Sequence, residues 1–222
     1  MTHTPLNVKE LRDQLHALAT RDGIRHWDLG ASRGMNASVQ VDRGEAKQMK
    51  AAQRSSITVR VWNEQGLVGV TSTSDLSPGG LDKALKGAYQ ASSFGNTEDI
   101  PGFSPLATAP IPELDRPLKP SQSIQTLLST LKDVEGELLA KHPAIETVPY
   151  NGLSEGNSER IYLNSEGALR HMQRTQASLY LYARAEESGR KPRSGGAVRV
   201  ALGSADLDLG GCIQEAAERT IS

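Results

Sequence analysis

The side chains that could do chemistry in this 222-residue chain are few and scattered. No two of the histidines have the short spacing of metal ligands on one helix or strand. They are His3, His16, His26, His142 and His171. The sequence also lacks a His-Glu-x-x-His motif, a Gly-x-Ser-x-Gly elbow, a phosphate-binding loop and a dinucleotide-binding glycine pattern. We therefore assign no catalytic, cofactor-binding or metal-binding residue, and we interpret His16 and His142 as structural.

The single cysteine, Cys212, has two interpretations. It falls in the first turn of a predicted helix over 209–221, where the helix dipole lowers a thiol pKa and favours a reactive thiolate. It also shares an apolar helical face with Ile213, Ala216 and Ala217, and buried cysteine behaves as a small hydrophobe. We favour the buried, structural role. One cysteine cannot form an internal disulfide, which indicates a reducing compartment.

Three further groups of side chains also have a chemical and a structural interpretation. The segment 184–193 carries two glutamates, three arginines and one lysine, which could form an anion site, but we favour a solvated loop. Asp75 and Asp206 could form an acid pair, although both precede predicted helices and are more simply explained as helix-entry residues. Three methionines could line a groove, but we interpret them as core filler. They are Met35, Met49 and Met172.

Composition excludes several classes of protein. The chain is 37% hydrophobic and 23% charged, with a net charge of −1, which is typical of a globular protein. It lacks the positive charge needed to grip nucleic acid phosphates, and its 4% of aromatic residues leaves little for base stacking. We find neither a secretory signal nor a membrane-spanning stretch. We therefore expect a cytoplasmic protein with no membrane and no direct nucleic acid partner.

The elements that must position these side chains follow from hydrophobic periodicity. Apolar residues spaced by three and four predict helices over 7–22, 77–94, 123–141 and 209–221. Alternating residues predict short antiparallel strands, with turns at 42–44, 63–66 and 164–167. The strands are expected at 38–41, 57–62, 67–73, 145–150, 159–164, 168–173, 177–183 and 198–202. The chain is therefore predicted to be α+β, with antiparallel sheets packed by helices.

The two halves of the sequence resemble each other. Gln53-Arg54 and Gln173-Arg174 are 120 positions apart, and each pair precedes an alternating strand. Asp75-Leu76 and Asp206-Leu207 are 131 positions apart, and each opens a helix. We predict two similar α+β lobes, at 1–100 and 121–222, joined by a proline-rich linker or crossover at 101–120. The duplication requires that both Gln-Arg pairs occupy the same kind of element.

An open antiparallel sheet has edges with unpaired amides and carbonyls. Such an edge can accept an extended peptide or a strand of another subunit. A stand-alone peptide-binding or adaptor module is therefore one possible function. A second alternative is an enzyme that uses dispersed carboxylates or Cys212.

Several segments in order resemble the amino-terminal part of the TldD/PmbA family. The first is Val59-Arg60-Val61-Trp62, followed by the turn and strand over 66–73 and by Asp75-Leu76-Ser77. The helix ending at 88–92 and the turn at 164–167 continue the resemblance, which covers the chain from about Trp27 onward. It implies a cytoplasmic protease system that degrades unfolded or extended peptides and is associated with modulation of DNA gyrase.

In that family, TldD-like and PmbA-like (TldE-like) chains pair, and the zinc ligands lie on a His-Glu-x-x-x-His helix of the TldD-like chain. This sequence has no such motif, so no catalytic or metal residue transfers to it. The resemblance implies a non-catalytic role, with zinc in a TldD-like partner, or self-association. The family's chains are about twice as long, so we expect 121–222 to continue into a further C-terminal domain of a PmbA-like parent.

Overall fold

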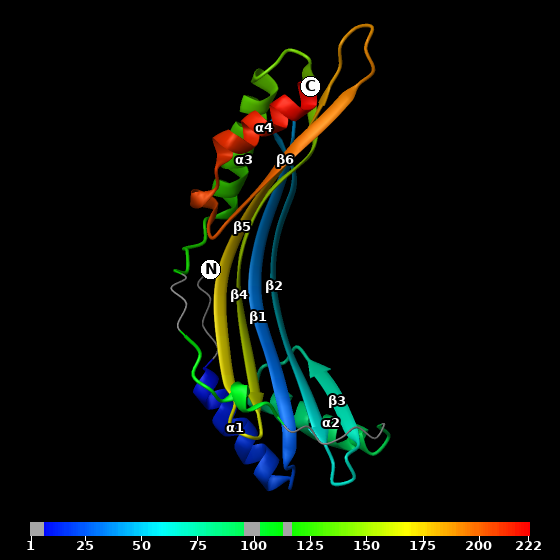
Figure 1. Cartoon of the computed structure of the whole chain (residues 1–222), viewed down its shortest axis with the longest axis vertical. Helices are drawn as coiled ribbons and strands as arrows, with labels where there is room; N and C mark the ends of the chain where they lie inside the picture. The colour runs from blue at the N-terminus through cyan, green and yellow to red at the C-terminus, as the bar shows by residue number, and fades with distance from the viewer. Residues whose placement is uncertain (1–6, 96–102, 113–116) are drawn as a thin grey trace. The chain divides into compact units, whose positions relative to one another are not determined.

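The computed structural model describes residues 7–95, 103–112 and 117–222 (Figure 1). Four helices contain most of the apolar periodicity: α1 (Val8–Arg21), α2 (Pro78–Ser92), α3 (Ile124–Ala140) and α4 (Leu209–Ile221). The strands are β1 (His26–Asp42), β2 (Glu45–Trp62), β3 (Val68–Thr73), β4 (Ile145–Asn164), β5 (Leu169–Ala185) and β6 (Arg193–Ala201). The chain is α+β, as predicted.

Polar residues begin the helices where the sequence predicts them. The Asn7 side chain accepts a hydrogen bond from the Glu10 amide at the start of α1, and Ser123 does the same for α3. Ser77 and Asp208 cap α2 and α4. Each side-chain oxygen satisfies one of the free amides of the first turn. The two pairs of caps are separated by 116 and 131 positions, and the second offset is the one that relates Asp75-Leu76 to Asp206-Leu207.

The strands are much longer than the alternation predicts. β4 runs without interruption for 20 residues, where the sequence indicates two short strands, and β2 extends back to Glu45. The first ten residues of β2, at 45–54, are all exposed, so they carry no alternation of apolar and polar residues to reveal a strand. The six strands form one sheet in the order β3-β2-β1-β4-β5-β6, rather than a separate sheet in each half.

The chain divides into two compact units. Unit 1 comprises 1–34, 53–116 and 158–173, and unit 2 comprises 35–52, 117–157 and 174–222. Each unit has two of the helices and parts of four long strands. The units therefore do not coincide with the ranges 1–100 and 121–222, because β1, β2, β4 and β5 each contribute residues to both.

Unit 1 buries one face of its strands against α1 and α2. Trp27, Ile57 and Leu163 from the strands pack with Leu15 of α1 and Leu81 of α2. Burying such side chains contributes about 1.5–3 kcal/mol each. The backbone of the edge strand β3 packs directly against the backbone of α2. A Cβ on Gly69 would lie only 2.0 Å from the Ala88 carbonyl oxygen.

Unit 2 repeats this plan with α3 and α4. Leu179 and Leu181 of β5 pack with Leu131 of α3 and Ile213 of α4. The edge strand β6 meets α4 at Gly195, where a Cβ would lie 2.4 Å from the backbone of Arg219. Both predicted Gln-Arg pairs lie in strands, in β2 and β5, so the structure meets the condition set for a duplication.

The proline-rich region has little regular structure. Within 103–112 and 117–123, the structure has only a 3-10 turn at Pro105–Ala107. The remaining parts of the predicted linker, 101–102 and 113–116, lie outside the described residues. The described part nevertheless has defined contacts, which are important for the site described below.

Candidate functional site

Cys212 is a core residue of unit 2. Its side chain is fully buried in the first turn of α4, beside Ile213 and Ala216. Burial raises the pKa of the thiol to about 11, because removal from water disfavours the thiolate more than the helix dipole favours it. This agrees with the structural interpretation.

The charged segment 184–193 forms ion pairs within itself. Arg184 pairs with Glu186 at 2.6 Å, and Arg190 pairs with Glu187 at 3.1 Å. Arg193 also donates to Glu187. These pairs leave no concentrated positive field, which favours the solvated loop over an anion site.

The two carboxylates of the predicted acid pair, Asp75 and Asp206, each have a structural partner. Asp75 accepts from the Ser77 amide at 2.9 Å, and hydrogen bonds from Ser77 hold the pKa of Asp75 below its usual value. Asp208 accepts from the Gly211 amide at 2.9 Å. Asp206 pairs with Lys119 at 3.1 Å. The helix-entry interpretation therefore holds for Asp75 and Asp208, whereas Asp206 is occupied by its ion pair with Lys119.

Three of the histidines have partners within the chain, and His3 lies outside the described residues. The His16 ring stands edge-on to Trp27 with ring centroids 5.1 Å apart, and His142 Nδ1 accepts from the Ala144 amide. His171 Nε2 lies 2.7 Å from the buried carboxylate of Glu159. Across residues 7–95, 103–112 and 117–222, no group of three or more His, Cys, Asp or Glu side chains is placed to hold a metal. The described residues therefore do not fit a zinc site.

Two methionines contradict the prediction of core filler. The side chains of Met49 and Met172 are 41% and 47% exposed. Both lie near the start of a long strand at exposed positions, so their apolar character does not bury them. Since Met49 belongs to unit 2 and Met172 to unit 1, they do not form one groove within either unit.

The open edges of the sheet are β3 and β6. On β6, several edge carbonyls already accept hydrogen bonds. Thr220 Oγ1 donates to the Gly195 oxygen, Arg219 to the Gly196 oxygen and Arg199 to the Val198 oxygen, at 3.0–3.2 Å. A peptide that added as a strand beside these residues would have to displace two guanidinium groups. The exposed face of unit 2 is therefore a better candidate for a binding site than its edge.

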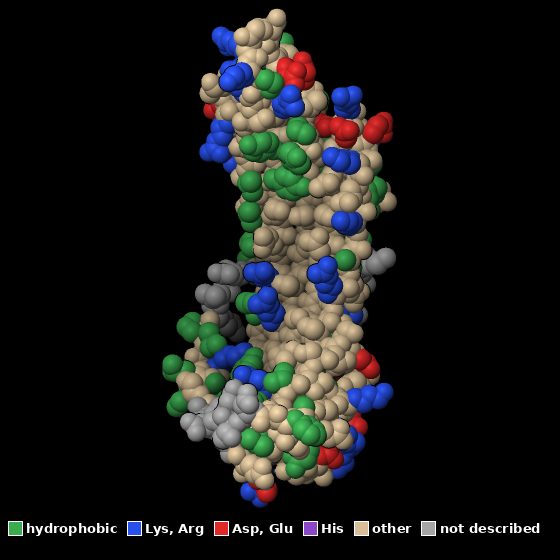
Figure 2. Space-filling view, turned by 90° about the vertical axis from the view of Figure 1, so that its right-hand side faces the viewer, with side chains coloured by type: hydrophobic (Ala, Val, Ile, Leu, Met, Phe, Trp, Pro, Cys, Tyr) green, Lys and Arg blue, Asp and Glu red, His purple; other side chains and the backbone are tan. Residues whose placement is uncertain are grey.

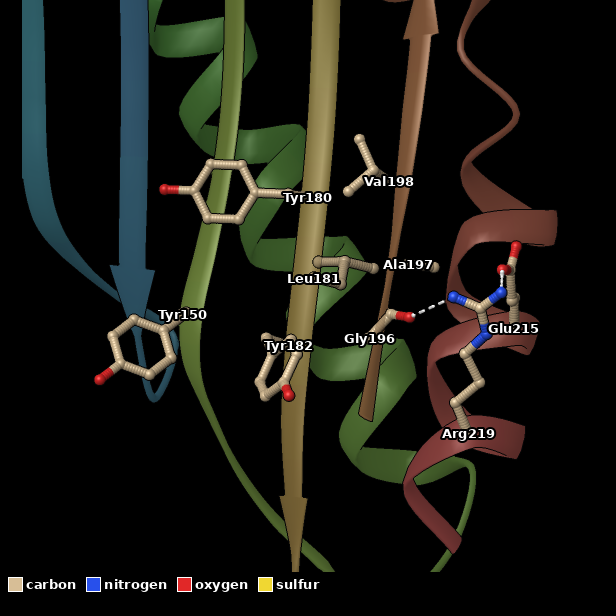
Figure 3. A pocket seen from close by; sticks show the side chains of 9 residues that line it. All are labelled: Tyr150, Tyr180, Leu181, Tyr182, Gly196, Ala197, Val198, Glu215 and Arg219. Atoms are coloured by element: carbon tan, nitrogen blue, oxygen red, sulfur yellow. Dashed lines mark hydrogen bonds and ion pairs between the residues drawn. The ribbon is translucent and has the colours of Figure 1, made fainter. Parts of the chain in front are cut away.

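The exposed face of unit 2 has a set of aromatic and aliphatic side chains that we call the tyrosine face: Tyr150, Tyr180, Tyr182 and Val198. In β5, Leu179, Leu181 and Ala183 point into the core, so Tyr180 and Tyr182 project from the opposite side. Figure 3 shows the three rings in front of the strands, with α3 behind them. In the space-filling view, hydrophobic side chains gather on one face of the part that carries α3 and α4 (Figure 2).

Glycines make room for two of the tyrosine rings. A Cβ at position 152 would lie 2.4 Å from the Tyr180 ring, and one at position 196 would lie 2.5 Å from the Tyr182 ring. Gln40 donates to the Tyr180 hydroxyl at 2.8 Å, and the rings of Tyr150 and Tyr182 stand edge to face at 6.4 Å. The rings are therefore held in place before any ligand arrives.

The tyrosine face lines a groove of about 720 Å³. Glu215 and Arg219 of α4 close one side of the groove (Figure 3) and pair with each other at 2.6 Å. A smaller hollow of about 260 Å³ also borders Tyr150 and is lined by Gln40 and Lys47. The groove has the volume of a ligand site, with a mainly apolar lining and few polar groups.

The corresponding face of unit 1 is covered. Trp62 lies 120 positions before Tyr182 and is only 4% exposed, because Phe103 stands edge-on to its ring at 6.2 Å. Arg60 lies over the same ring at 5.2 Å and its Nε donates to the buried Asp28 at 2.9 Å. Burial and the nearby charge of Asp28 raise the pKa of Tyr162. The result is a closed polar and aromatic layer across β1, β2 and β4.

The cover of unit 1 is a segment of its own chain, 103–109, that we call the strap. Arg170 of β5 donates to the Leu106 and Ala109 carbonyl oxygens at 2.8 and 2.7 Å. Phe103 contacts β2 through Trp62, so the strap crosses the strands from β2 to β5. One guanidinium thus holds two backbone carbonyls of a proline-containing segment that includes the 3-10 turn at Pro105–Ala107.

Sequence reasoning did not predict the tyrosine face. The alternating run 177–183 predicts a strand with one buried face, and the exposed side chains of that strand include two tyrosines. Large aromatic residues at the outward positions of an amphipathic strand were the available signal. Tyr150 joins them because β4 continues as one strand beside β5 from 145 to 164, where the sequence indicates two short strands.

Two domain families match the sequence. Residues 27–92 match the PmbA/TldA metallopeptidase domain 1, and residues 117–222 match the PmbA/TldA metallopeptidase central domain. The sequence matches no curated protein. In the part of the chain that the structure describes, no helix is long and apolar enough to cross a membrane.

Solved structures with the same fold cover nearly the whole chain. A proposed modulator of DNA gyrase from Bacteroides thetaiotaomicron has a TM-score of 0.80 at 19% identity, and one from Thermotoga maritima has 0.74 at 20%. TldE from Thermococcus kodakarensis has 0.76 at 15%. Each alignment covers 96% of this chain but only 47–49% of the other chain. The chain thus spans about half the length of these structures.

Proposed function

Because the chain belongs to the PmbA/TldD metallopeptidase family, we propose that it is the amino-terminal, non-catalytic region of a component of a PmbA/TldD-type metallopeptidase. The observation that carries this proposal is the order of the two matched domains, with domain 1 at 27–92 and the central domain at 117–222. We further propose a PmbA-like parent. Its work is to help degrade or process unfolded peptides in the cytoplasm.

The catalytic zinc of this proposal is held by a TldD-like partner. The described residues of this chain do not fit a metal site, and His16, His142 and His171 have other partners. What the chain supplies is surface: long strands that extend beyond the helices, and an exposed groove lined by tyrosines. A stand-alone adaptor that binds peptide at a sheet edge is less well supported, because arginines already occupy carbonyls of β6.

The test is to tag the native gene, purify the protein from its source cells and identify what co-purifies. We expect a zinc-bearing TldD-like subunit, and cleavage of an unfolded protein that a chelator abolishes. The Cys212→Ala variant should retain this activity, because the thiol is buried. A protein of 23.9 kDa without a zinc-bearing partner would contradict the proposal. Cleavage that survives chelation but is lost in C212A would support a cysteine enzyme instead.

A further inference from the structure

We propose that the tyrosine face of unit 2 binds an extended peptide segment with proline and aromatic or aliphatic side chains and no charge across its centre. This inference deepens the proposed function, on which it rests for the source of the peptide. The binding itself depends only on residues of unit 2. Three observations support it: the counterpart in unit 1, the shape of the face and its charges.

The internal duplication shows what kind of segment covers such a face. The 120-position offset that relates the two Gln-Arg pairs also relates Arg60 to Tyr180 and Trp62 to Tyr182. In unit 1, Phe103 of the strap stands against Trp62 at this position, and the strap has the sequence Phe-Ser-Pro-Leu-Ala-Thr-Ala. In unit 2, Tyr182 is 46% exposed. The occupant inferred for unit 2 therefore has the chemistry of the segment that unit 1 already holds.

The tyrosine face also has the features of a site for proline-containing peptides. Grooves lined by aromatic rings bind polyproline segments, whose preformed conformation loses little entropy on binding. Here the glycines at 152 and 196 leave space for the rings, and Gln40 fixes the hydroxyl of Tyr180. Rigid tyrosines supply contact area at a low entropy cost. Binding thus requires little rearrangement of the chain.

The charges around the groove favour a peptide that has an uncharged centre and one acidic end. At one side Glu215 pairs with both Arg219 and Arg199, and Arg199 also pairs with Asp208, so these four charges balance. Lys47, in the hollow beside Tyr150, has no ion-pair partner among the described residues. An acidic residue at that end of the peptide would meet this lysine, whereas a negative charge over the rings would lose water without gaining a partner.

The experiment uses a fluorescent synthetic peptide with the sequence of residues 103–112, Phe-Ser-Pro-Leu-Ala-Thr-Ala-Pro-Ile-Pro. Its binding to the 222-residue chain is measured by fluorescence anisotropy. We expect saturable binding, and at least about tenfold weaker binding after Tyr180→Ala or Tyr182→Ala. Tyr89→Ala on α2 is the matched control, because Tyr89 is also exposed, at 42%, but lies in unit 1. It should leave the affinity unchanged.

A peptide with the phenylalanine and prolines replaced by serine should bind at least about tenfold more weakly. A glutamate added at one terminus should strengthen binding in a salt-dependent way that Lys47→Glu removes. Because both tyrosine rings are exposed, their removal leaves the core intact, and a far-ultraviolet spectrum verifies folding. Tyr180→Phe provides a second variant that keeps the ring and loses only the contact with Gln40.

Equal binding of the serine peptide, or unchanged binding after Tyr182→Ala, would overturn the inference. Self-association that Tyr182→Ala abolishes, without peptide binding, would assign the face to a second copy of the chain and would also overturn it. The result of this binding experiment can be distinguished from the result that tests the proposed function. Peptide binding by a chain that has no zinc-bearing partner in cells would leave the inference standing and contradict only the protease role.

Discussion

Unit 1 and unit 2 have the same plan but differ in what covers the outer face of their strands. In unit 1, the strap holds Trp62 at 4% exposure. In unit 2, its counterpart Tyr182 is 46% exposed and borders an open groove. The comparison shows that a duplicated sheet face need not stay equivalent, because the described residues 103–109 contact the face of unit 1 and no described segment does the same for unit 2.

The units also differ in how they secure a hairpin. In unit 2, the buried carboxylate of Glu135 accepts from the Arg43 and Gly44 amides, in a turn where both residues have positive φ. By the 116-position offset of α1 and α3, the counterpart of Glu135 is the buried Ala19. In unit 1, the turn after β4 is held by its own Asn164, which accepts from the Glu166 and Ala168 amides.

The largest expected effect on stability concerns the feature that the two units share most closely, the contact of a glycine in the edge strand with the backbone of a helix. Gly69→Ala and Gly195→Ala each place a methyl group within 2.4 Å of helix backbone, which should lower the free energy of unfolding by about 3 kcal/mol. Urea denaturation measures this. Gly136→Ala on α3 is the control, because nothing lies within 4 Å of the added atom, and it should stabilise by about 0.5–1 kcal/mol. A G195A protein as stable as the unsubstituted chain would show that the two edge strands do not pack equivalently against their helices.

The hairpin difference predicts an effect specific to unit 2. Glu135→Ala leaves two turn amides without their acceptor and should lower the free energy of unfolding by about 2 kcal/mol. Glu137→Ala changes an exposed glutamate on the same helix and should alter it by less than about 0.5 kcal/mol. Equal losses from the two substitutions would show that the buried carboxylate does not secure the turn.

Releasing the strap should make unit 1 resemble unit 2. Phe103→Ala or Arg170→Ala removes a contact of the strap and should cost about 1 kcal/mol. It should also expose Trp62, which is detected as a red shift and stronger acrylamide quenching of tryptophan fluorescence. Phe94→Ala is the control, because Phe94 is already 93% exposed. Unchanged quenching in R170A would mean that the strap does not depend on Arg170.

The smallest effect concerns Cys212, whose counterpart at the 131-position offset is the buried Leu81. The thiol pKa is raised to about 11 in the folded chain, above its value in the unfolded chain of about 8.5. The folded state therefore binds more protons between these values, so the stability contribution is complete below about pH 8.5 and is lost as pH rises toward 11. Cys212→Ala should remove this alkaline component from urea titrations. Rapid alkylation of the folded protein at pH 7 would contradict burial.

Local signals predicted much of the fold. Asn7, Ser77 and Ser123 begin helices because their side chains satisfy free amides, and the turns at 42–44 and 164–167 form where the sequence places them. The Gln-Arg pairs revealed the duplication. The long strands were not predicted, because residues 45–54 are exposed and lack periodicity. The strap and the tyrosine face depend on contacts between distant segments, which no local pattern encodes.

The most direct test uses the five tyrosines of the chain, Tyr89, Tyr150, Tyr162, Tyr180 and Tyr182, as reporters. The protein is labelled with 3-fluorotyrosine, and each fluorine signal is assigned with a single Tyr→Phe variant. The peptide of residues 103–112 is then titrated and followed by fluorine NMR. We predict shifts at Tyr150, Tyr180 and Tyr182, with Tyr89 unchanged. Shifts confined to Tyr89 or Tyr162, or no shift at Tyr182, would contradict peptide binding at the tyrosine face.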